Sequence, residues 1–252
     1  MSKKRTLTIV LTLLVAVCLL ATTALAAVVP STPSMPSAPS GATAPSTPDN
    51  PTAPSQPSQP SQPSQPSEPE LKFVDVNEGD WFYTSVMWAV KNGVTVGTTA
   101  TTFEPYTACT RAQMIEFLWN AVGKPAATIK SVPFTDVPES GSDDYWYEDS
   151  LLWAYEAGIV AGTNDGSTFS PDQVCTRAEM ISFIARLLSD GATADMPFVD
   201  VPASAWYYNE VQWAWANGLT VGTNDGTTFS PDNACIRAEA VEFLYNAFAE
   251  VE

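Results

Sequence analysis

The feature that most constrains the fold is a series of motifs that occurs three times after residue 70, with a period of about 60 to 66 residues. Each copy contains Phe-x-Asp-Val, a Trp-aromatic pair, Trp-Ala, a glycine step, Phe-x-Pro and an Arg-Ala pair, in that order. The copies begin at Phe73, Phe134 and Phe198. A repeat of this length is typical of supersecondary units that bury a shared core between neighbours.

Each copy has the pattern of a helix, a turn and a second helix. In the third copy, Tyr208, Val211 and Trp215 lie three and four residues apart, and Gly218 follows as a C-terminal stop. One unit of some 55 residues can hardly bury its aromatic side chains alone. We therefore expect one all-α domain built from three helix-turn-helix repeats. The second helices are expected over 111–122, over 177–188 and from about 237.

The start of the chain has the composition of a secretory signal peptide. Basic residues at positions 3–5 precede an apolar run from Leu7 to Leu20, and Ala24-Leu25-Ala26 offers a cleavage site. The apolar run is too short to cross a bilayer. We therefore expect a signal peptide over 1–26, a secreted product and no membrane span after cleavage.

A linker rich in proline, serine and glutamine is expected between the signal and the repeats, over 27–70. A proline falls at every third residue from 51 to 69. Such a stretch cannot bury a core, and it favours disorder with polyproline II geometry. The predicted repeats then occupy 71–125, 132–190 and 196–252.

The charge and the missing histidines exclude several classes of function. The chain has 28 acidic and 11 basic residues, and the signal removes three bases, which leaves a net charge near 8 − 28 = −20. So acidic a surface repels nucleic acid. Without histidine the common His-dependent triads are excluded, and three near-equal copies favour a repetitive ligand over one asymmetric catalytic pocket. We expect no enzyme activity, no cofactor and no nucleic-acid partner.

Metal binding and disulfide pairing are not expected either. Cys109, Cys175 and Cys235 occupy matching places in the three repeats, and their odd number and wide spacing favour buried apolar thiols. The Asn-Asp-Gly stretches at 164–166 and 224–226 lack the spacing of a calcium loop and are expected to form tight turns.

The second helices start with a recognisable cap in two of the three repeats. Thr110 with Gln113, and Thr176 with Glu179, have the spacing of capping boxes. Ile236 replaces the threonine in the third repeat, which is expected to weaken that cap by about 1 kcal/mol.

An arginine follows each cap position: Arg111, Arg177 and Arg237. A cation in the first helical turn opposes the helix dipole. Arginine beside free helix N–H groups would suit a bound carboxylate or phosphate. The alternative is an ion pair with an acid of a neighbouring repeat.

The tryptophan near the start of each repeat could either stack on a sugar or pack in the core. The glycines between the helices could serve either the close approach of a ligand or the geometry of the turn.

The full motif series, over about residues 72–252, resembles the S-layer homology family. The resemblance implies a three-pronged pseudo-trimer that anchors proteins non-covalently to secondary cell-wall polysaccharide on peptidoglycan, often through pyruvate ketals. It implies grooves between adjacent prongs in which the motif arginine is the main contact, with help from a tryptophan and a glycine backbone. The implied ligand contacts are Arg111, Arg177, Arg237, Trp81, Trp146, Trp206, Gly97, Gly162 and Gly222.

The function expected from this resemblance is cell-wall anchoring by a secreted cell-surface protein that binds acidic or pyruvylated wall sugars. The alternative is a structural surface-layer protein that self-assembles or recruits another surface protein. Repeat one departs from the family pattern at Gln113, where glutamate is usual, and repeat three departs at Ile236. The three grooves are therefore expected to differ in strength, with the third the weakest.

Overall fold

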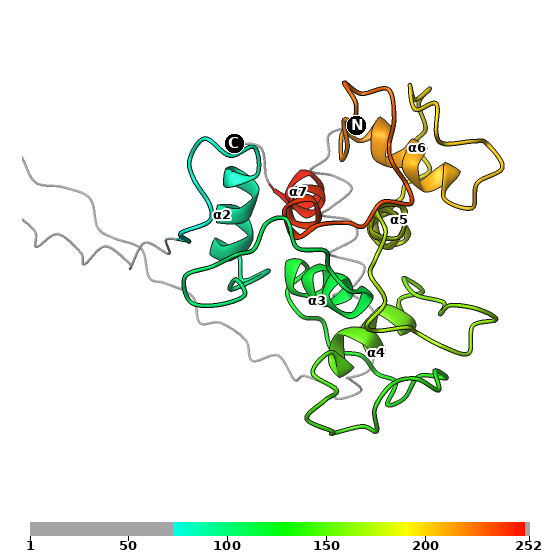
Figure 1. The fold of residues 1–252 in the computed structure, drawn as a ribbon. Coiled ribbons are helices and arrows are strands. Elements are labelled where there is room, and N and C mark those ends of the chain that lie inside the picture. Colours follow the sequence, from blue (N-terminus) through cyan, green and yellow to red (C-terminus); the bar gives the residue numbers. More distant parts are fainter. Residues whose placement is uncertain (1–72, 250–252) are drawn as a thin grey trace, which may run out of the picture. The chain divides into compact units, whose positions relative to one another are not determined.

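The structure is a computed structural model, and it describes residues 73–249 (Figure 1). These residues all fall within one compact unit. The predicted signal peptide and linker lie outside the described residues.

Six helices, two in each repeat, make up the regular structure of residues 73–249. The same residues contain isolated β-bridges but no strand, which agrees with the predicted all-α class. The helices are α2 (Tyr83–Lys91), α3 (Arg111–Ala121), α4 (Glu148–Glu156), α5 (Arg177–Leu188), α6 (Tyr208–Ala216) and α7 (Arg237–Phe248).

The closest helix pairs join different repeats. Helix α4 packs on α3, α6 packs on α5, and α2 packs on α7, while α3, α5 and α7 contact one another at the centre (Figure 1). The first helix of each repeat thus covers the second helix of the repeat before it, and α7 closes the ring against α2. The expected helix-turn-helix unit therefore does not pack as a self-contained hairpin, because each unit buries its apolar faces against its neighbours.

The expected capping boxes are present. The Thr110 hydroxyl accepts from the backbone N–H of Gln113 at 3.3 Å, and Thr176 accepts from Glu179 at 3.2 Å. Ile236 makes no side-chain cap bond at the start of α7, as expected. Local capping chemistry therefore accounts for two of the three second-helix starts.

A cyclic set of backbone hydrogen bonds joins the three cysteines just before the second helices. The N–H of Cys109 donates to the carbonyl of Cys235 at 3.1 Å, Cys175 donates to Cys109 at 2.9 Å, and Cys235 donates to Cys175 at 2.9 Å. All three thiols are buried and unpaired, as predicted. The repeats therefore meet around a pseudo-threefold axis at these residues.

The buried thiols predict a loss of stability at alkaline pH. Burial raises the pKa of Cys109 from 9.0 to about 11, and burial raises the pKa of Cys175 and Cys235 well above 9.0. Because the folded chain keeps these thiols protonated to a higher pH than the unfolded chain does, thiol ionisation in the unfolded chain favours unfolding as the pH rises past about 9. We expect the urea concentration at the unfolding midpoint to decrease as the pH rises from 9 to 11. This dependence of the midpoint on pH should be weaker in a triple Cys-to-Ala variant, and an unchanged dependence would contradict this assignment.

The Phe-x-Asp-Val aspartates fasten the turn before each second helix. Asp136 accepts from the backbone N–H groups of Phe169 and Ser170, both at 2.7 Å, and Ser170 has a positive φ of 57°. Asp75 and Asp200 bind the equivalent groups in their own repeats. Two hydrogen bonds to one carboxylate hold a backbone conformation that a non-glycine residue rarely adopts.

Gly222 stands where the turn passes closest to the first motif of its repeat. Its φ is 79°, and a Cβ there would overlap the ring of Phe198 and the carbonyl oxygen of Thr228. Gly218 has a similar φ of 70° but nothing within 4 Å of a Cβ. We expect Gly222→Ala to lower the free energy of unfolding by at least about 2 kcal/mol more than Gly218→Ala, because it adds a clash to the same strain. Equal losses in urea titrations would refute this account of Gly222.

Candidate ligand-binding site at the repeat junctions

The N-terminal N–H groups of the second helices are already bound by the neighbouring repeat. The N–H of Arg111 donates to the carbonyl of Gln173 at 2.9 Å, and that of Ala112 donates to Pro171 at 3.0 Å. Helices α5 and α7 repeat this pattern with the loops of repeats three and one. The expectation of free N–H groups beside each arginine is therefore wrong, because the cyclic packing brings a loop carbonyl to each of them.

The arginines lie at three junctions between repeats. The first junction holds Arg111 against repeat two, the second holds Arg177 against repeat three, and the third holds Arg237 against repeat one. The three residues are only 3%, 4% and 5% exposed. Such burial is unusual for arginine and requires compensating contacts.

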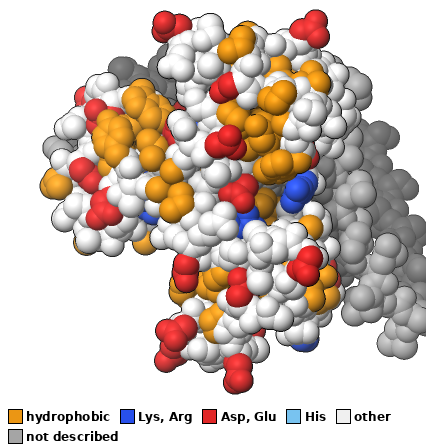
Figure 2. All heavy atoms as spheres, turned by 45° about the vertical axis from the view of Figure 1, so that its right-hand side comes forward, with side chains coloured by type: hydrophobic (Ala, Val, Ile, Leu, Met, Phe, Trp, Pro, Cys, Tyr) orange, Lys and Arg blue, Asp and Glu red, His pale blue; other side chains and the backbone are white. Residues whose placement is uncertain are grey.

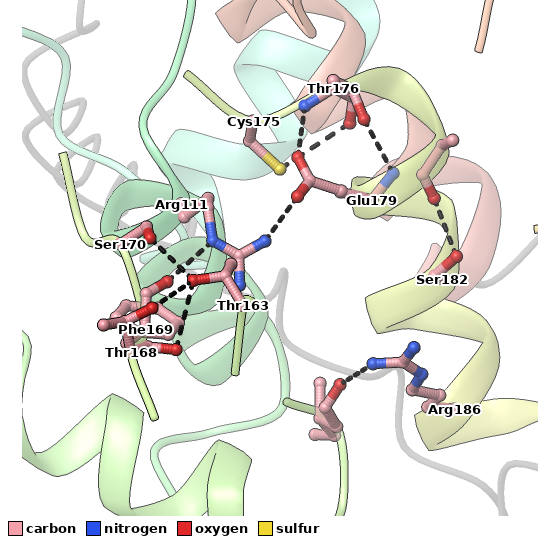
Figure 3. A network of polar contacts seen from close by, with 12 residues as sticks. Arg111, Thr163, Thr168, Phe169, Ser170, Cys175, Thr176, Glu179, Ser182 and Arg186 are labelled. Atoms are coloured by element: carbon pink, nitrogen blue, oxygen red, sulfur yellow. Dashed lines mark hydrogen bonds and ion pairs between the residues drawn. The ribbon is translucent and has the colours of Figure 1, made fainter. Parts of the chain in front are cut away.

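In the first junction the guanidinium of Arg111 is bound on several sides (Figure 3). Its Nε donates to the carbonyl of Phe169 at 2.9 Å, and its Nη1 forms an ion pair with Glu179 at 2.6 Å. The rings of Phe169 and Phe183 lie 5.2 and 5.4 Å from Cζ. Arg111 therefore joins repeat one to repeat two.

The second junction repeats this arrangement. Nε of Arg177 donates to the carbonyl of Phe229 at 2.9 Å, and Nη1 pairs with Glu239 at 2.5 Å. The rings of Phe229 and Phe243 flank the guanidinium. The alternative of an ion pair with a neighbouring repeat's acid is thus confirmed at these two junctions.

The third junction departs from the other two. Nε of Arg237 donates to the carbonyl of Phe103 at 2.7 Å, and the rings of Phe103 and Phe117 flank the guanidinium. Within residues 73–249, however, Arg237 has no ion-pair partner. The position that corresponds to Glu179 and Glu239 is occupied by Gln113.

The opening tryptophans are exposed at all three repeats. Trp81 and Trp146 are each 56% exposed and Trp206 is 58% exposed, so the core alternative is wrong for them. Each indole stands at 77–82° to the ring of the next residue, with centroids 5.1–5.2 Å apart. A tryptophan that is held by one neighbouring ring and stays largely exposed is available for stacking on a sugar.

The inter-helix glycines have an internal explanation. Gly97 and Gly162 have φ values of 91° and 86°, and a Cβ on either would touch the opening phenylalanine of its repeat. The turn-geometry alternative therefore accounts for them, and ligand contact by Gly97, Gly162 and Gly222 stays a prediction. The aspartates of the opening motif were missed as structural residues, although their recurrence in all three repeats could have singled them out.

The sequence profile described as the S-layer homology domain matches residues 72–115, 133–181 and 197–241. The chain belongs to the S-layer homology family. This confirms the resemblance drawn from the motifs, with three tandem copies of the domain. Membership supports cell-wall anchoring at the level of the family.

The relatives that match this chain are much longer proteins. The chain is 35% identical over 133 residues to a cell surface protein of Thermoanaerobacter kivui. This alignment covers 50% of this chain and 16% of that protein. It is 25% identical over 176 residues to the S-layer protein sap of Bacillus anthracis, with 68% of this chain and 20% of that protein covered. It is 34% identical over 114 residues to an endoglucanase of Bacillus sp. (strain KSM-635), and this alignment covers 45% of this chain and 11% of that protein.

These matches identify a secreted cell-surface protein. The aligned part spans a fifth or less of each of the three relatives, so their whole activities do not transfer to this chain. No helix within residues 73–249 has the length and apolar character needed to cross a membrane. The same part of the chain contains no group of three His, Cys, Asp or Glu side chains able to hold a metal ion.

Proposed function

We propose that the protein is a non-catalytic anchor that binds secondary cell-wall polysaccharide at the junctions between its repeats. The observation that carries the proposal is the nearly equal exposure of Trp81, Trp146 and Trp206 at equivalent positions of the three repeats. Three exposed aromatic side chains at equivalent positions suit a polymer with a repeating unit.

An acidic polymer fits the remaining features of the surface. The face in Figure 2 carries many scattered carboxylates and few Lys or Arg side chains. A negatively charged polymer therefore cannot be held by general attraction and needs a local cation. A guanidinium at a repeat junction supplies such a cation in an environment of low dielectric constant, and its use by the ligand is part of the proposal.

Co-sedimentation with bacterial sacculi that retain their polysaccharide tests the proposal. We expect the wild-type chain to pellet with these sacculi. A Trp81→Ala, Trp146→Ala, Trp206→Ala variant should stay in the supernatant, because three stacking contacts of about 1 kcal/mol each are lost.

A matched control replaces three other exposed apolar side chains, in Val74→Ala, Val199→Ala and Val221→Ala, which are 75–83% exposed. This control should pellet like the wild type, and both variants should unfold at the wild-type urea concentration. Undiminished pelleting of the tryptophan variant would refute the proposal.

A further inference from the structure

The acids of the first two junctions each bridge two donors. Oε2 of Glu179 accepts from the N–H of Thr176 at 2.8 Å, and Oε1 accepts from Arg111 at 2.6 Å (Figure 3). Glu239 does the same for Ile236 and Arg177. One carboxylate therefore completes the helix cap and neutralises the arginine of the preceding repeat.

Gln113 can do only the first of these tasks. Its Oε1 accepts from the N–H of Thr110 at 3.0 Å, so the second atom of its amide group is Nε2, which is a donor. Arg237 is a donor only. Two donors therefore occupy the place where the other junctions pair a donor with an acceptor.

The charge of Arg237 is left with weak internal compensation. The residue is 5% exposed, and besides its bond to the carbonyl of Phe103 it has a long contact of 3.5 Å with the Thr95 hydroxyl. Burial lowers the pKa of Arg237, while Cys109 and more distant acids oppose that shift. A buried cation without an ion-pair partner is costly, so an external anion at this position would stabilise the folded chain.

The loop beside Arg237 also differs from its counterparts. The carbonyls of Pro105 and Thr107 accept from the N–H groups of Ala238 and Arg237, both at 2.9 Å, and Tyr106 lies between them. The equivalent places in the other two junctions hold Asp172 and Asp232.

Tyr106 extends the aromatic surface of repeat one. It is 68% exposed and stands edge-on to Phe82 at 5.7 Å, and Trp81 stands edge-on to the same ring at 5.2 Å. Repeats two and three have an acid in place of this second exposed aromatic. Repeat one thus presents two open rings that both contact one buried ring.

The third junction also has fewer acidic side chains than the other two, which favours it as a site for an anion. The first junction has Asp136, Asp172 and Glu179, and the second has the three equivalent acids. The third has only two, Asp75 and Glu104. Glu104 stands where the other two repeats have a serine, whereas Tyr106 and Gln113 stand where they have acids. Neither of these two acids lies within ion-pair distance of Arg237 in the described part of the chain.

We propose that the third junction is the site for a carboxylate-bearing sugar of the wall polymer, with Arg237 and Nε2 of Gln113 donating to the carboxylate. Trp81 and Tyr106 pack against the sugar rings. Arg111 and Arg177, which already hold internal carboxylates, act instead as links between repeats. This inference rests on the proposed function and reverses the expectation that the third site is the weakest.

Gln113→Glu tests the inference because it supplies the missing carboxylate from within the chain. In sedimentation with polysaccharide-bearing sacculi, we expect this variant to need at least about a tenfold higher sacculus concentration for half-binding, since its new carboxylate occupies Arg237. Its urea midpoint should be no lower than that of the wild type, because the introduced carboxylate would pair with Arg237. Tyr106→Asp, which makes repeat one resemble the other two, should weaken binding in the same direction.

Gln173→Glu is the matched control, since it makes the same chemical change in the loop of the first junction. It should bind within about twofold of the wild type, because it leaves the third junction unchanged. If the wild type pellets and Gln113→Glu pellets equally well, the assignment of the third junction is wrong while the proposed function stands. If the wild type itself fails to pellet, the proposed function is wrong. A lowered urea midpoint in Gln113→Glu would also contradict the predicted pairing with Arg237.

Discussion

Replacing Arg177 with alanine will lower the free energy of unfolding by about 3 kcal/mol. The substitution removes a side chain that is 5% exposed, together with its bond to the carbonyl of Phe229, and leaves the carboxylate of Glu239 without its partner. Loss of one member of a buried pair costs about 3–5 kcal/mol, and the lower end applies because Glu239 is 21% exposed. Urea titration followed by tryptophan fluorescence measures the change.

Arg186→Ala provides the comparison for Arg177→Ala. Arg186 lies on the same helix and donates one hydrogen bond to the carbonyl of Ile159 at 2.8 Å, with no ion pair among the described residues. Its loss should cost about 1 kcal/mol. If the two variants lose the same stability, Arg177 does not link repeats two and three as described.

A chain that ends at Ile236, and therefore lacks α7, will not fold cooperatively. Helix α7 contacts α2, α3 and α5, and it buries Val241, Phe243 and Leu244 among them. Burial of three such side chains contributes about 5–9 kcal/mol, which is comparable to the whole stability of a typical domain. Thermal unfolding followed by circular dichroism should show no sharp transition, and adding a separate chain of residues 192–252 should restore one.

The truncation distinguishes one composite domain from three independent ones. In the ring seen here, α2 has its main helix partner in the last repeat. Independent repeats would leave the first two unaffected by the loss of α7. A sharp transition at the wild-type temperature in the truncated chain would therefore contradict the cyclic packing.

Local features of this fold could be predicted from the sequence because they depend on nearby residues. Thr110 and Thr176 identify helix starts to the residue, since a capping box involves only four consecutive positions. The glycine stops and the all-α class follow from the same short-range patterns. The pairing of helices between repeats could not be predicted, because the apolar stripe of α2 does not indicate which partner covers it.

The candidate site depends on contacts between distant residues, and these were the hardest to predict. Arg111 meets Glu179 across 68 positions, so an acid that looked like part of a local cap has a second task in another repeat. The departure at Gln113 was visible in the sequence, but its effect on Arg237 follows only from the cyclic arrangement. The exposure of Trp81 was likewise undecidable from its neighbours in the chain.

Titration of isolated wall polysaccharide into the full chain, before and after mild acid removes ketal-linked carboxylates, tests the central claim most directly. Isothermal calorimetry should detect binding to the untreated polymer, with affinity at least about tenfold weaker after treatment, because the neutral sugar no longer compensates a buried guanidinium. Gln113→Glu should show little difference between the two polymers. Equal affinity of the wild type for both polymers would contradict recognition of an acidic wall sugar at the repeat junctions.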